Sequence, residues 1–561
     1  MVRLLQLSLL IVLLASVSSS PCSTTPAAFV YHRMPRGAAL RVVQKDFSTH
    51  LTIPQLYQKS NLCMVASGGK KSSPSGRVAI VGAGISGLAC AKELQAHGMD
   101  VLLFDTGRLH PGGRCSSKML KVDGGKTQVL FDHSAQFLSA PSSYVSTSPS
   151  SPSDTWNKWV CEMECDGVLR EWDSQRIGTL SRGGVFSPRA TDSGGVQPRA
   201  LIGSGGMRAI PAYMARNLEI DRPKWVSKAR QNKDGTWRLW HYQEELDDFD
   251  YLVVAHNGKC AARLMKSAGP ALAPVARLLE TKFGANLRGG STPRFMQLCS
   301  LYVLMVVLDG PVPLPTPNLE GAFVEGVPAL SWVADQGAKL GQNVEKGPEN
   351  EGTRRAWVIV SSPTFAEEHK VPQENIPIET AAEVTSLLLQ AFRLALGKEG
   401  REYDAAFKVS TSALQLWGAG NPISVADVSE EVPFIFQAST GCGVCGDWML
   451  APSIPAAARS GIALAKHIAD HHKAKKKLHE GGWVGQILTQ DMNVGCKFRP
   501  AQGARPIGAF EGDKPPTAAS VSRNLQRGGG HMRGGRREGR GGRGGKGGRG
   551  GRGEGNHIPG C

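Results

Sequence analysis

The stretch that decides the fold runs from residue 77 to residue 115 and reads RVAIVGAGISGLACAKELQAHGMDVLLFDTGRLHPGGRC. The apolar run at 78–81 predicts a buried strand, and residues 88–94 predict a helix. A second apolar run at 101–104 predicts another strand, which ends in Asp105. Strand, turn, helix and strand in this order predict the start of a parallel α/β sheet.

Three glycines in the turn follow the pattern G-x-G-x-x-G, and each has a physical role in binding a dinucleotide. Gly82 permits the tight turn, Gly84 lets the backbone approach a pyrophosphate, and Gly87 lets the helix pack closely on the strand. The N-terminus of the helix presents free N–H groups to the phosphates. Asp105, 18 residues after Gly87, can accept hydrogen bonds from ribose hydroxyls. The segment therefore predicts a dinucleotide site.

A second glycine-rich segment, just past the acidic residue, favours FAD over NAD. It contains Arg108 and then Gly112, Gly113 and Arg114. The glycines bring more backbone amides to the pyrophosphate, and an arginine supplies a fixed fork of donors for phosphate oxygens. Taken alone, residues 111–113 could also form an ordinary Pro-Gly-Gly turn.

A third segment, CGVCGDWMLAPSIPAAARSGIALAKHIA at 442–469, indicates where the chain returns to the cofactor. Asp447, after Gly446, can accept a hydrogen bond from the ribityl chain of a flavin. The N-terminus of the helix that follows would face the flavin ring and the pyrophosphate. The two ends of the body are therefore expected to meet around one flavin.

Together with FDHSAQF at 131–137, these segments resemble the FAD-dependent amine oxidase superfamily. Within it, the chain is most similar to the renalase-like branch and to plastid-directed FAD/NAD(P)-binding oxidoreductases of plants and algae. WVSKARQNKDGTWRLW at 225–240 and EGAFVEGVPALSWVAD at 320–335 resemble segments of the latter group. The likeness runs from about 77 to 470. It implies an α/β protein with a discontinuous Rossmann-like FAD-binding domain and an inserted α+β substrate domain.

The resemblance also implies which residues hold the cofactor, bound without a covalent link. Asp105 stands where the superfamily more often has Glu, and Val226 matches a strand residue whose backbone meets adenine. The implied FAD contacts are Gly82, Gly84, Gly87, Asp105, Arg108, Gly112, Gly113, Arg114, Val226, Gly446, Asp447 and Trp448. A covalent flavin bond through Cys445 is the alternative.

The catalytic residues are harder to identify than the cofactor contacts. Monoamine oxidases use an active-site lysine near the flavin, and no such lysine can be placed in this sequence. The candidate catalytic residues are Trp332, Trp417 and His133, with Asp335 and Trp448 as further pocket residues, because aromatic walls orient planar or cationic substrates. Each tryptophan could equally be a buried core ring, and His133 a structural histidine.

The resemblance implies an FAD-dependent oxidoreductase that takes two electrons from a small organic substrate. That substrate could be an amine, a reduced nicotinamide isomer or an isoprenoid, with oxygen or a quinone reoxidising the flavin. A nicotinamide-binding role for the glycine motif is the alternative among enzymes. No metal is expected, although Cys161, Cys165, Cys442 and Cys445 leave open a zinc site, and the last two a redox pair.

We expect five zones along the 561 residues. The FAD-binding domain comprises 72–140, 200–265 and 430–475, and the substrate domain comprises 141–199 and 266–429. Residues 1–71 form a leader, 476–526 a weakly structured stretch, and 527–561 a Gly/Arg-rich disordered tail.

The composition of the two ends suggests location and a second kind of partner. An apolar run at 4–17, followed by basic, acid-poor sequence to 71, resembles a signal peptide joined to a transit peptide, which predicts a plastid protein; secretion is the alternative. We expect no membrane span in the mature protein. The tail contributes much of the net charge of +17 and could bind RNA, beside a body that holds flavin without catalysis.

Overall fold

The computed structural model describes residues 76–141, 151–189, 199–287, 292–310, 312–342 and 354–501. The predicted leader, the predicted tail and the RNA-binding hypothesis that rests on it lie outside the described residues.

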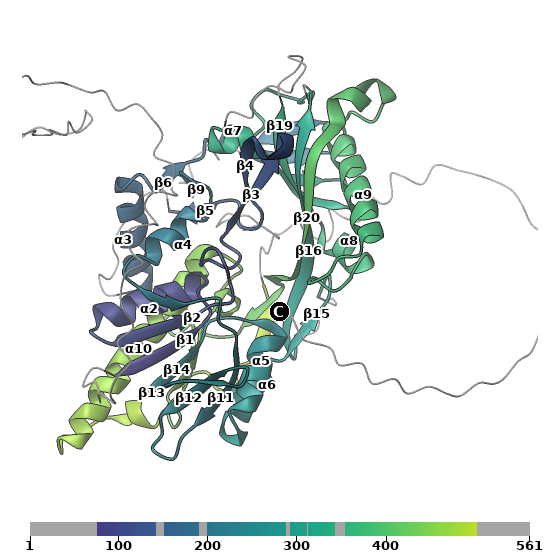
Figure 1. The fold of residues 1–561 in the computed structure, drawn as a ribbon. Helices are drawn as coiled ribbons and strands as arrows, with labels where there is room; N and C mark the ends of the chain where they lie inside the picture. Colours follow the sequence, from purple (N-terminus) through teal and green to yellow (C-terminus); the bar gives the residue numbers. More distant parts are fainter. Residues whose placement is uncertain are drawn as a thin grey trace, which may run out of the picture. The chain divides into compact units, whose positions relative to one another are not determined.

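The glycine motif lies, as predicted, between the first strand and helix of a parallel sheet. β1 (Arg77–Val81) pairs in parallel with β2 (Asp100–Phe104), and α2 (Ile85–Ala96) connects them. The sheet has six strands in the order β10-β2-β1-β14-β23-β22, of which β22 is antiparallel to its neighbour (Figure 1). Its other strands are β10 (Glu219–Asp221), β14 (Tyr251–Val254), β22 (Ile435–Gln437) and β23 (Cys442–Val444).

The two faces of this sheet are covered by different elements, because successive strand residues point to opposite sides. Val78 and Ile80 pack in one cluster with α2 and α10 (Ile454–His479). Ala79 and Val81 pack in another, with an antiparallel sheet and two helices. Those elements are β11 (Val226–Gln231), β12 (Trp237–His241), β13 (Glu244–Phe249), α5 (Gly258–Ser267) and α6 (Ala273–Leu278).

A second, eight-stranded sheet is built from other parts of the chain. Its order is β15-β16-β19-β18-β17-β7-β8, and β20 also pairs with β16. The strands are β7 (Ile177–Ser181), β8 (Val185–Pro188), β15 (Thr281–Phe283), β16 (Met296–Asp309), β17 (Gly321–Glu325), β18 (Leu330–Asp335), β19 (Arg355–Ser361) and β20 (Lys408–Pro422). α8 (Pro363–Glu368) and α9 (Ile378–Leu396) lie along this sheet in Figure 1.

Smaller elements connect the two sheets. The short strands are β3 (Ser117–Val122), β4 (Thr127–Asp132), β5 (Leu138–Ala140), β6 (Leu169–Glu171), β9 (Arg199–Gly203), β21 (Ser424–Ala426) and β24 (Phe498–Pro500). The remaining α-helices are α3 (Pro152–Cys165), α4 (Ala209–Met214) and α7 (Gln336–Leu340). The 3₁₀ turns are η2 (Asp123–Gly125), η3 (Pro270–Leu272), η4 (Arg401–Phe407), η5 (Asp447–Met449) and η6 (Gln486–Leu488).

The described chain is an α/β protein with a Rossmann-like sheet, as predicted. The strands of the six-stranded sheet come from three separate stretches inside the predicted FAD-binding domain, and those of the eight-stranded sheet from inside the predicted substrate domain. The exact boundaries of these domains stay predictions.

Residues 476–501 differ from the expectation of weak structure. α10 continues to His479, and β24 pairs with β21. Phe498 is buried near Trp448, and the Asn493 side chain donates to the carbonyls of Val432 and Phe434. These partners lie far back in the chain, so local composition could not reveal them.

Candidate cofactor site

A cavity of about 670 Å³ opens where the predicted cofactor segments meet. It lies beyond the carboxyl ends of β1, β2 and β14, which is where open parallel sheets bind ligands. Ten of the twelve predicted FAD contacts line it: Gly82, Gly84, Asp105, Gly112, Gly113, Arg114, Val226, Gly446, Asp447 and Trp448. Segments more than 300 residues apart in the chain therefore form one cavity.

The three glycines of the first turn differ in what the lack of a side chain allows. Gly82 has a φ of +110°, which favours glycine. A Cβ added to Gly84 would meet nothing within 4 Å, so its backbone is open on the cavity side. A Cβ on Gly87 would stand 1.9 Å from the Gly82 carbonyl oxygen. Gly87 does not line the cavity, and its lack of a side chain lets α2 approach β1.

The second glycine segment docks on the first. The Gly112 N–H donates to the Ala83 carbonyl at 2.8 Å, and Gly112 forms a short parallel bridge with Gly84. Gly112 and Gly113 both have positive φ values, of +130° and +57°. This brings backbone from two loops to one edge of the cavity.

The Asp105 carboxylate is fixed by backbone donors. It accepts hydrogen bonds from the Ala83 N–H at 2.8 Å and from the Gly107 N–H at 2.6 Å. Each carboxylate oxygen has two lone pairs, so Asp105 can still accept from a ribose hydroxyl. Arg108, by contrast, is exposed and does not line the cavity.

Arg114 and Asp447, both named from the sequence, pair with each other. Two parallel hydrogen bonds of 2.8 and 2.9 Å join the guanidinium to the carboxylate, and Arg114 also donates to the Gly420 carbonyl. Burial lowers the pKa of Arg114, but the charge and hydrogen bonds of Asp447 outweigh it, so the pKa is raised overall. The pair connects the two ends of the body across the cavity.

Ser460 fixes the backbone next to this pair, a role the sequence did not reveal. Its hydroxyl accepts from the Gly446 N–H at 3.0 Å and donates to the Pro433 carbonyl at 2.6 Å. A Cβ on Gly461 would stand 2.1 Å from the Ser86 carbonyl oxygen, so α10 and α2 are in close contact here.

The cavity fits a dinucleotide such as FAD. Beyond the open backbone at Gly84, two of its lining residues carry buried polar atoms without a partner among the described residues: the indole N–H of Trp448 and the side-chain amide nitrogen of Asn257. Buried donors normally have partners, so these two are suited to a polar ligand. Asn257 was not predicted, because it stands outside the glycine motifs.

Among the predicted catalytic residues, only Trp417 lines the cavity. His133 stacks on it, with ring centroids 5.5 Å apart, and the Trp417 indole N–H donates to the His133 carbonyl at 2.8 Å. Burial, and then the charge of Lys118, lower the pKa of His133 to about 4. His133 is therefore uncharged at neutral pH.

Trp332 and Asp335 do not line the cavity. Trp332 is fully buried against Phe137 and Phe323, which favours the packing role that the sequence left open. Asp335 accepts from the Ala338 N–H at the start of α7 and pairs with Arg355 at 2.7 Å.

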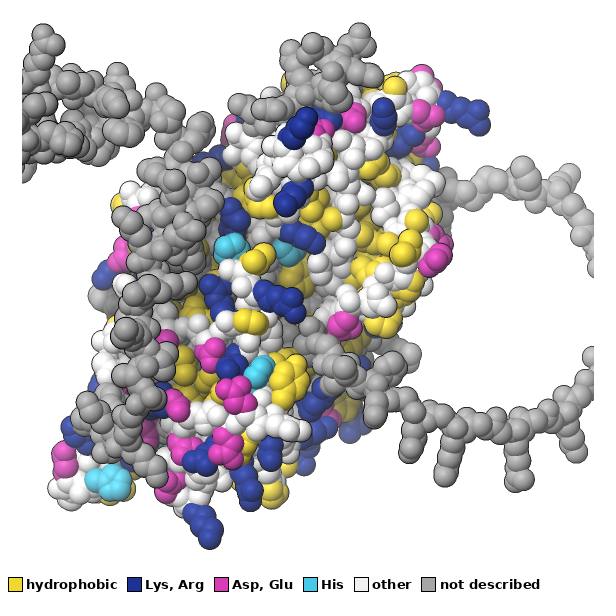
Figure 2. All heavy atoms as spheres, viewed as in Figure 1, with side chains coloured by type: hydrophobic (Ala, Val, Ile, Leu, Met, Phe, Trp, Pro, Cys, Tyr) yellow, Lys and Arg dark blue, Asp and Glu magenta, His cyan; other side chains and the backbone are white. Residues whose placement is uncertain are grey.

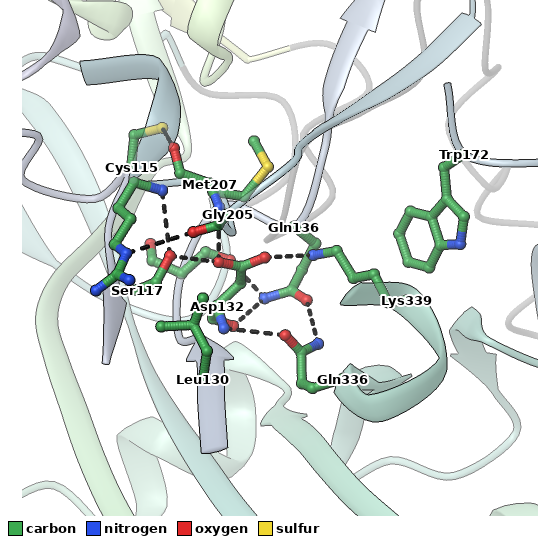
Figure 3. A network of polar contacts seen from close by, with 12 residues as sticks. Cys115, Ser117, Leu130, Asp132, Gln136, Trp172, Gly205, Met207, Gln336 and Lys339 are labelled. Atoms are coloured by element: carbon green, nitrogen blue, oxygen red, sulfur yellow. Dashed lines mark hydrogen bonds and ion pairs between the residues drawn. The ribbon is translucent and has the colours of Figure 1, made fainter. Parts of the chain in front are cut away.

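A buried ion pair lies behind the cavity wall formed by residues 134–137. The Lys339 ammonium donates to the Asp132 carboxylate at 2.8 Å, and both side chains are 0% exposed. Figure 3 shows Asp132 at the centre of a network that reaches three further segments. The partners besides Lys339 are Ser117, Gln136, Met207 and Gln336.

This network explains how the wall is held. The Gln136 side chain donates to the carbonyls of Asp132 and Ser134, while Ser134 and Phe137 line the cavity. Lys339 itself does not line it, so Lys339 is not a counterpart of the missing amine oxidase lysine at the ligand surface.

The cysteines do not form the pair that the sequence suggested. The Cys445 thiol lies within hydrogen-bonding reach of Cys90, and the Cys442 thiol contacts the Met265 sulfur at 3.8 Å. Burial raises the pKa of Cys442 to about 12, so that thiol is inert. No group of three or more metal-binding side chains occurs in the described part of the chain.

No helix among the described residues is both long and apolar enough to cross a membrane.

Comparison with known proteins supports the Rossmann-like character of the first segment. Residues 80–147 match the family described as an NAD(P)-binding Rossmann-like domain. Similar solved structures include a putrescine oxidase double mutant (13% identity, 70% of this chain and 98% of that chain, TM-score 0.41). Another is cyclohexylamine oxidase from Brevibacterium oxydans IH-35A (13% identity, 71% of this chain and 99% of that chain, TM-score 0.41). A third is reduced UDP-galactopyranose mutase (10% identity, 75% of this chain and 97% of that chain, TM-score 0.43). These likenesses are too distant to carry an argument about function.

Proposed function

We propose that the chain is an FAD-dependent oxidoreductase that takes two electrons from a small organic substrate, with oxygen or a quinone as the final acceptor. The observation that carries the proposal is that ten residues chosen from sequence as FAD contacts line one cavity. The resemblance to the amine oxidase superfamily, and to its renalase-like branch, supports the same reading. A chance arrangement would not gather residues from both ends of the body around an open glycine turn.

Different residues of the cavity would bind different parts of FAD. Backbone amides of the two glycine segments would hold the pyrophosphate, Asp105 would accept from the adenosine ribose, and Asp447 from the ribityl chain. When bound, FAD supplies the ability to accept a hydride from the substrate.

The aromatic part of the cavity lining would hold the substrate. Trp417 and Phe137 line it with apolar rings, and the hydrogen bond from Trp417 to the His133 carbonyl fixes the indole plane. Rings held in this way orient a flat or apolar substrate and exclude water from the reacting atoms.

The first test is the visible absorbance spectrum of the purified chain before and after heat denaturation. Flavin absorbance that is released into the supernatant supports noncovalent FAD. Flavin that stays with the precipitate supports a covalent bond to the protein. A folded chain that remains colourless after incubation with FAD contradicts the proposal.

A matched pair of glycine variants tests the position of the cofactor. Gly84→Val places a side chain in the space left for the pyrophosphate, and Gly485→Val adds one at a turn where a Cβ also meets nothing within 4 Å. We expect Gly84→Val to weaken FAD binding about 100-fold or more, because its side chain keeps the pyrophosphate away from the backbone amides. Gly485→Val should bind FAD as the wild type does.

We also propose that the chain is directed to a plastid, on the composition of residues 1–71. A fluorescent protein fused after residue 71 should colocalise with plastids in an alga that has secondary plastids. Secretion of the fusion into the medium would contradict this proposal and support the simple signal-peptide alternative.

A further inference from the structure

One side of the cavity mouth carries basic side chains that have no carboxylate partner among the described residues. Lys259 and Arg263, both on α5, line the cavity and also an adjoining hollow of about 410 Å³. The other charged residues that line this hollow are Lys266, Lys282 and one acid, Glu280. Glu280 is paired with Lys266 at 2.8 Å. It is therefore not available to neutralise Lys259 or Arg263.

The spacing on α5 brings these charges together. Lys259 and Arg263 are four residues apart, so they lie on the same face of the helix, where like charges repel. Both side chains are exposed. A fold gains nothing from such an arrangement, which favours a role for it in binding.

A third cation, Lys370, faces the same place from another part of the chain, and unlike Lys259 and Arg263 it pairs with an acid, Glu367, at 3.1 Å. The ammonium groups of Lys259 and Lys370 lie 5.3 and 5.2 Å from the centre of the Phe283 ring, and all three residues line the cavity. We call Lys259, Arg263 and Lys370 the cationic rim. Figure 2 shows Lys and Arg side chains over α5 and α6, while the Asp and Glu side chains of this face gather over β11, β12 and β13.

The other charges that line the cavity do not neutralise Lys259 and Arg263. Asp447 is paired with Arg114, and Asp105 is held by two backbone N–H groups. Lys224 is within ion-pair distance of Asp221 and Glu244. Glu374 is the remaining acid that lines the cavity. The mouth therefore presents an excess of positive charge to an incoming molecule.

The proposed cofactor does not need these cations. Its pyrophosphate would lie on the backbone amides of the two glycine segments, and its ribose hydroxyls on Asp105. The rim comes from α5 and from the segment after α8, which are separate in the chain from the two glycine segments. These cations are therefore left available to a second ligand.

We propose that the substrate of this site is a phosphate-bearing organic molecule, with its phosphate on the cationic rim and its organic part against Phe283 and Trp417. This inference rests on the proposed function and narrows its substrate class. Several clustered cations with one arginine among them suit a multiply charged phosphate, for which a guanidinium supplies paired donors. A protonated amine, the other polar substrate class considered, would meet like charges at the mouth.

The test is calorimetric titration of inorganic pyrophosphate into the full chain loaded with FAD. The variant Lys259→Gln with Arg263→Gln removes two rim charges, and Lys473→Gln with Lys476→Gln removes two exposed charges from the far end of α10. We expect the rim variant to bind pyrophosphate about tenfold or more weakly, since each lost contact is a charge-assisted hydrogen bond. The α10 variant should bind as the wild type does, and both should retain FAD.

Each other outcome contradicts the inference in its own way. Equal binding of pyrophosphate by the rim variant would show that the rim holds no phosphate. Loss of FAD from the rim variant would show that these cations hold the phosphates of the cofactor itself. Equal binding of succinate and pyrophosphate by the wild type would show that the rim attracts anions in general and does not select phosphate.

The same titration separates this inference from the proposed function. If the wild-type chain binds no flavin, the proposed function fails, and pyrophosphate is titrated into the flavin-free wild type and rim variant. A difference between those two would still support a phosphate site at the rim, and its absence would contradict one.

Discussion

Lys339 and Lys259 show two opposite ways in which this protein carries a positive charge. Lys339 is 0% exposed, pairs with Asp132 and lies behind the cavity wall (Figure 3). Lys259 is exposed at the cavity mouth and has no carboxylate partner among the described residues. A buried charge must be paired, because desolvation alone costs several kcal/mol. An exposed charge needs no such partner and can bind a ligand. Lys339 is therefore expected to stabilise the fold, and Lys259 to bind a ligand.

The largest expected effect comes from breaking the buried pair. Lys339→Met leaves the Asp132 carboxylate buried without its cation, and we expect it to lower the free energy of unfolding by about 3–5 kcal/mol. Urea denaturation of the full chain measures this. The control is Lys473→Met, which breaks a pair with Asp470 whose side chains are 64% and 60% exposed. It should change stability by less than about 0.5 kcal/mol. Similar effects for both would contradict the structural role of Lys339.

Arg114 gives an intermediate case, because its pair with Asp447 is half-buried. Arg114→Met removes two hydrogen bonds to the carboxylate, and we expect a loss of about 1.5–3 kcal/mol in unfolding free energy. The same denaturation experiment measures it. Arg114→Lys keeps the charge but not the parallel pair of bonds, and should recover only part of the loss. Full recovery by lysine would show that charge alone matters here.

His133 extends the comparison to a half-buried group whose pKa burial lowers despite the nearby charge of Asp132. Its pKa in the folded state is lowered to about 4, from an ordinary value of 6.5, mainly by burial. Between these two pH values the unfolded chain binds a proton that the folded chain does not, so stability falls as pH decreases through this range. Relative to His133→Gln, the wild type should lose about 1.5 kcal/mol between pH 6.5 and pH 5.

The measurement is thermal or urea unfolding of both proteins across that range. The variant will keep part of the pH dependence, because burial also lowers the pKa of His471 to about 4. Parallel pH profiles for the wild type and His133→Gln would contradict the assignment to His133.

Sequence patterns predicted the strand-turn-helix unit around Gly82, because its conformation depends on residues that are close together in the chain. The apolar run before Gly82, the glycine spacing and the acid at 105 are all set within one strand-turn-helix unit, and the structure forms that unit as expected. Asp447 and Arg114 were also named from their motifs. Their pairing was not, because 333 residues separate them and each motif by itself suggested a contact with the cofactor.

The sequence could not reveal residues whose roles depend on distant partners. Lys339 stands on a five-residue helix and would be read as a surface lysine, yet Asp132, 207 residues away, makes it a buried one. Asn257 belongs to no recognised motif, and only the folded chain places it in the cavity wall. Ser460 lies in the predicted return segment, but its hydrogen bond to Gly446 is seen only in the folded chain. Trp332 is a different case, because it is fully buried, which is the packing alternative that the sequence left open.

The smallest predicted effect is a gain in the free energy of unfolding when Arg263 of the cationic rim is replaced. It tests whether the rim charges lower the stability of the protein. Arg263 lies four residues after Lys259 and three before Lys266, so three cations share one side of α5. Each like-charge pair at this spacing destabilises a helix by roughly 0.2–0.5 kcal/mol. Arg263→Gln should therefore raise the unfolding free energy by a few tenths of a kcal/mol at low salt, and the gain should shrink in high salt. Urea denaturation at two salt concentrations measures both. A stability loss would mean that Arg263 makes a structural contact, whereas a gain together with weaker pyrophosphate binding would identify it as a residue kept for its ligand.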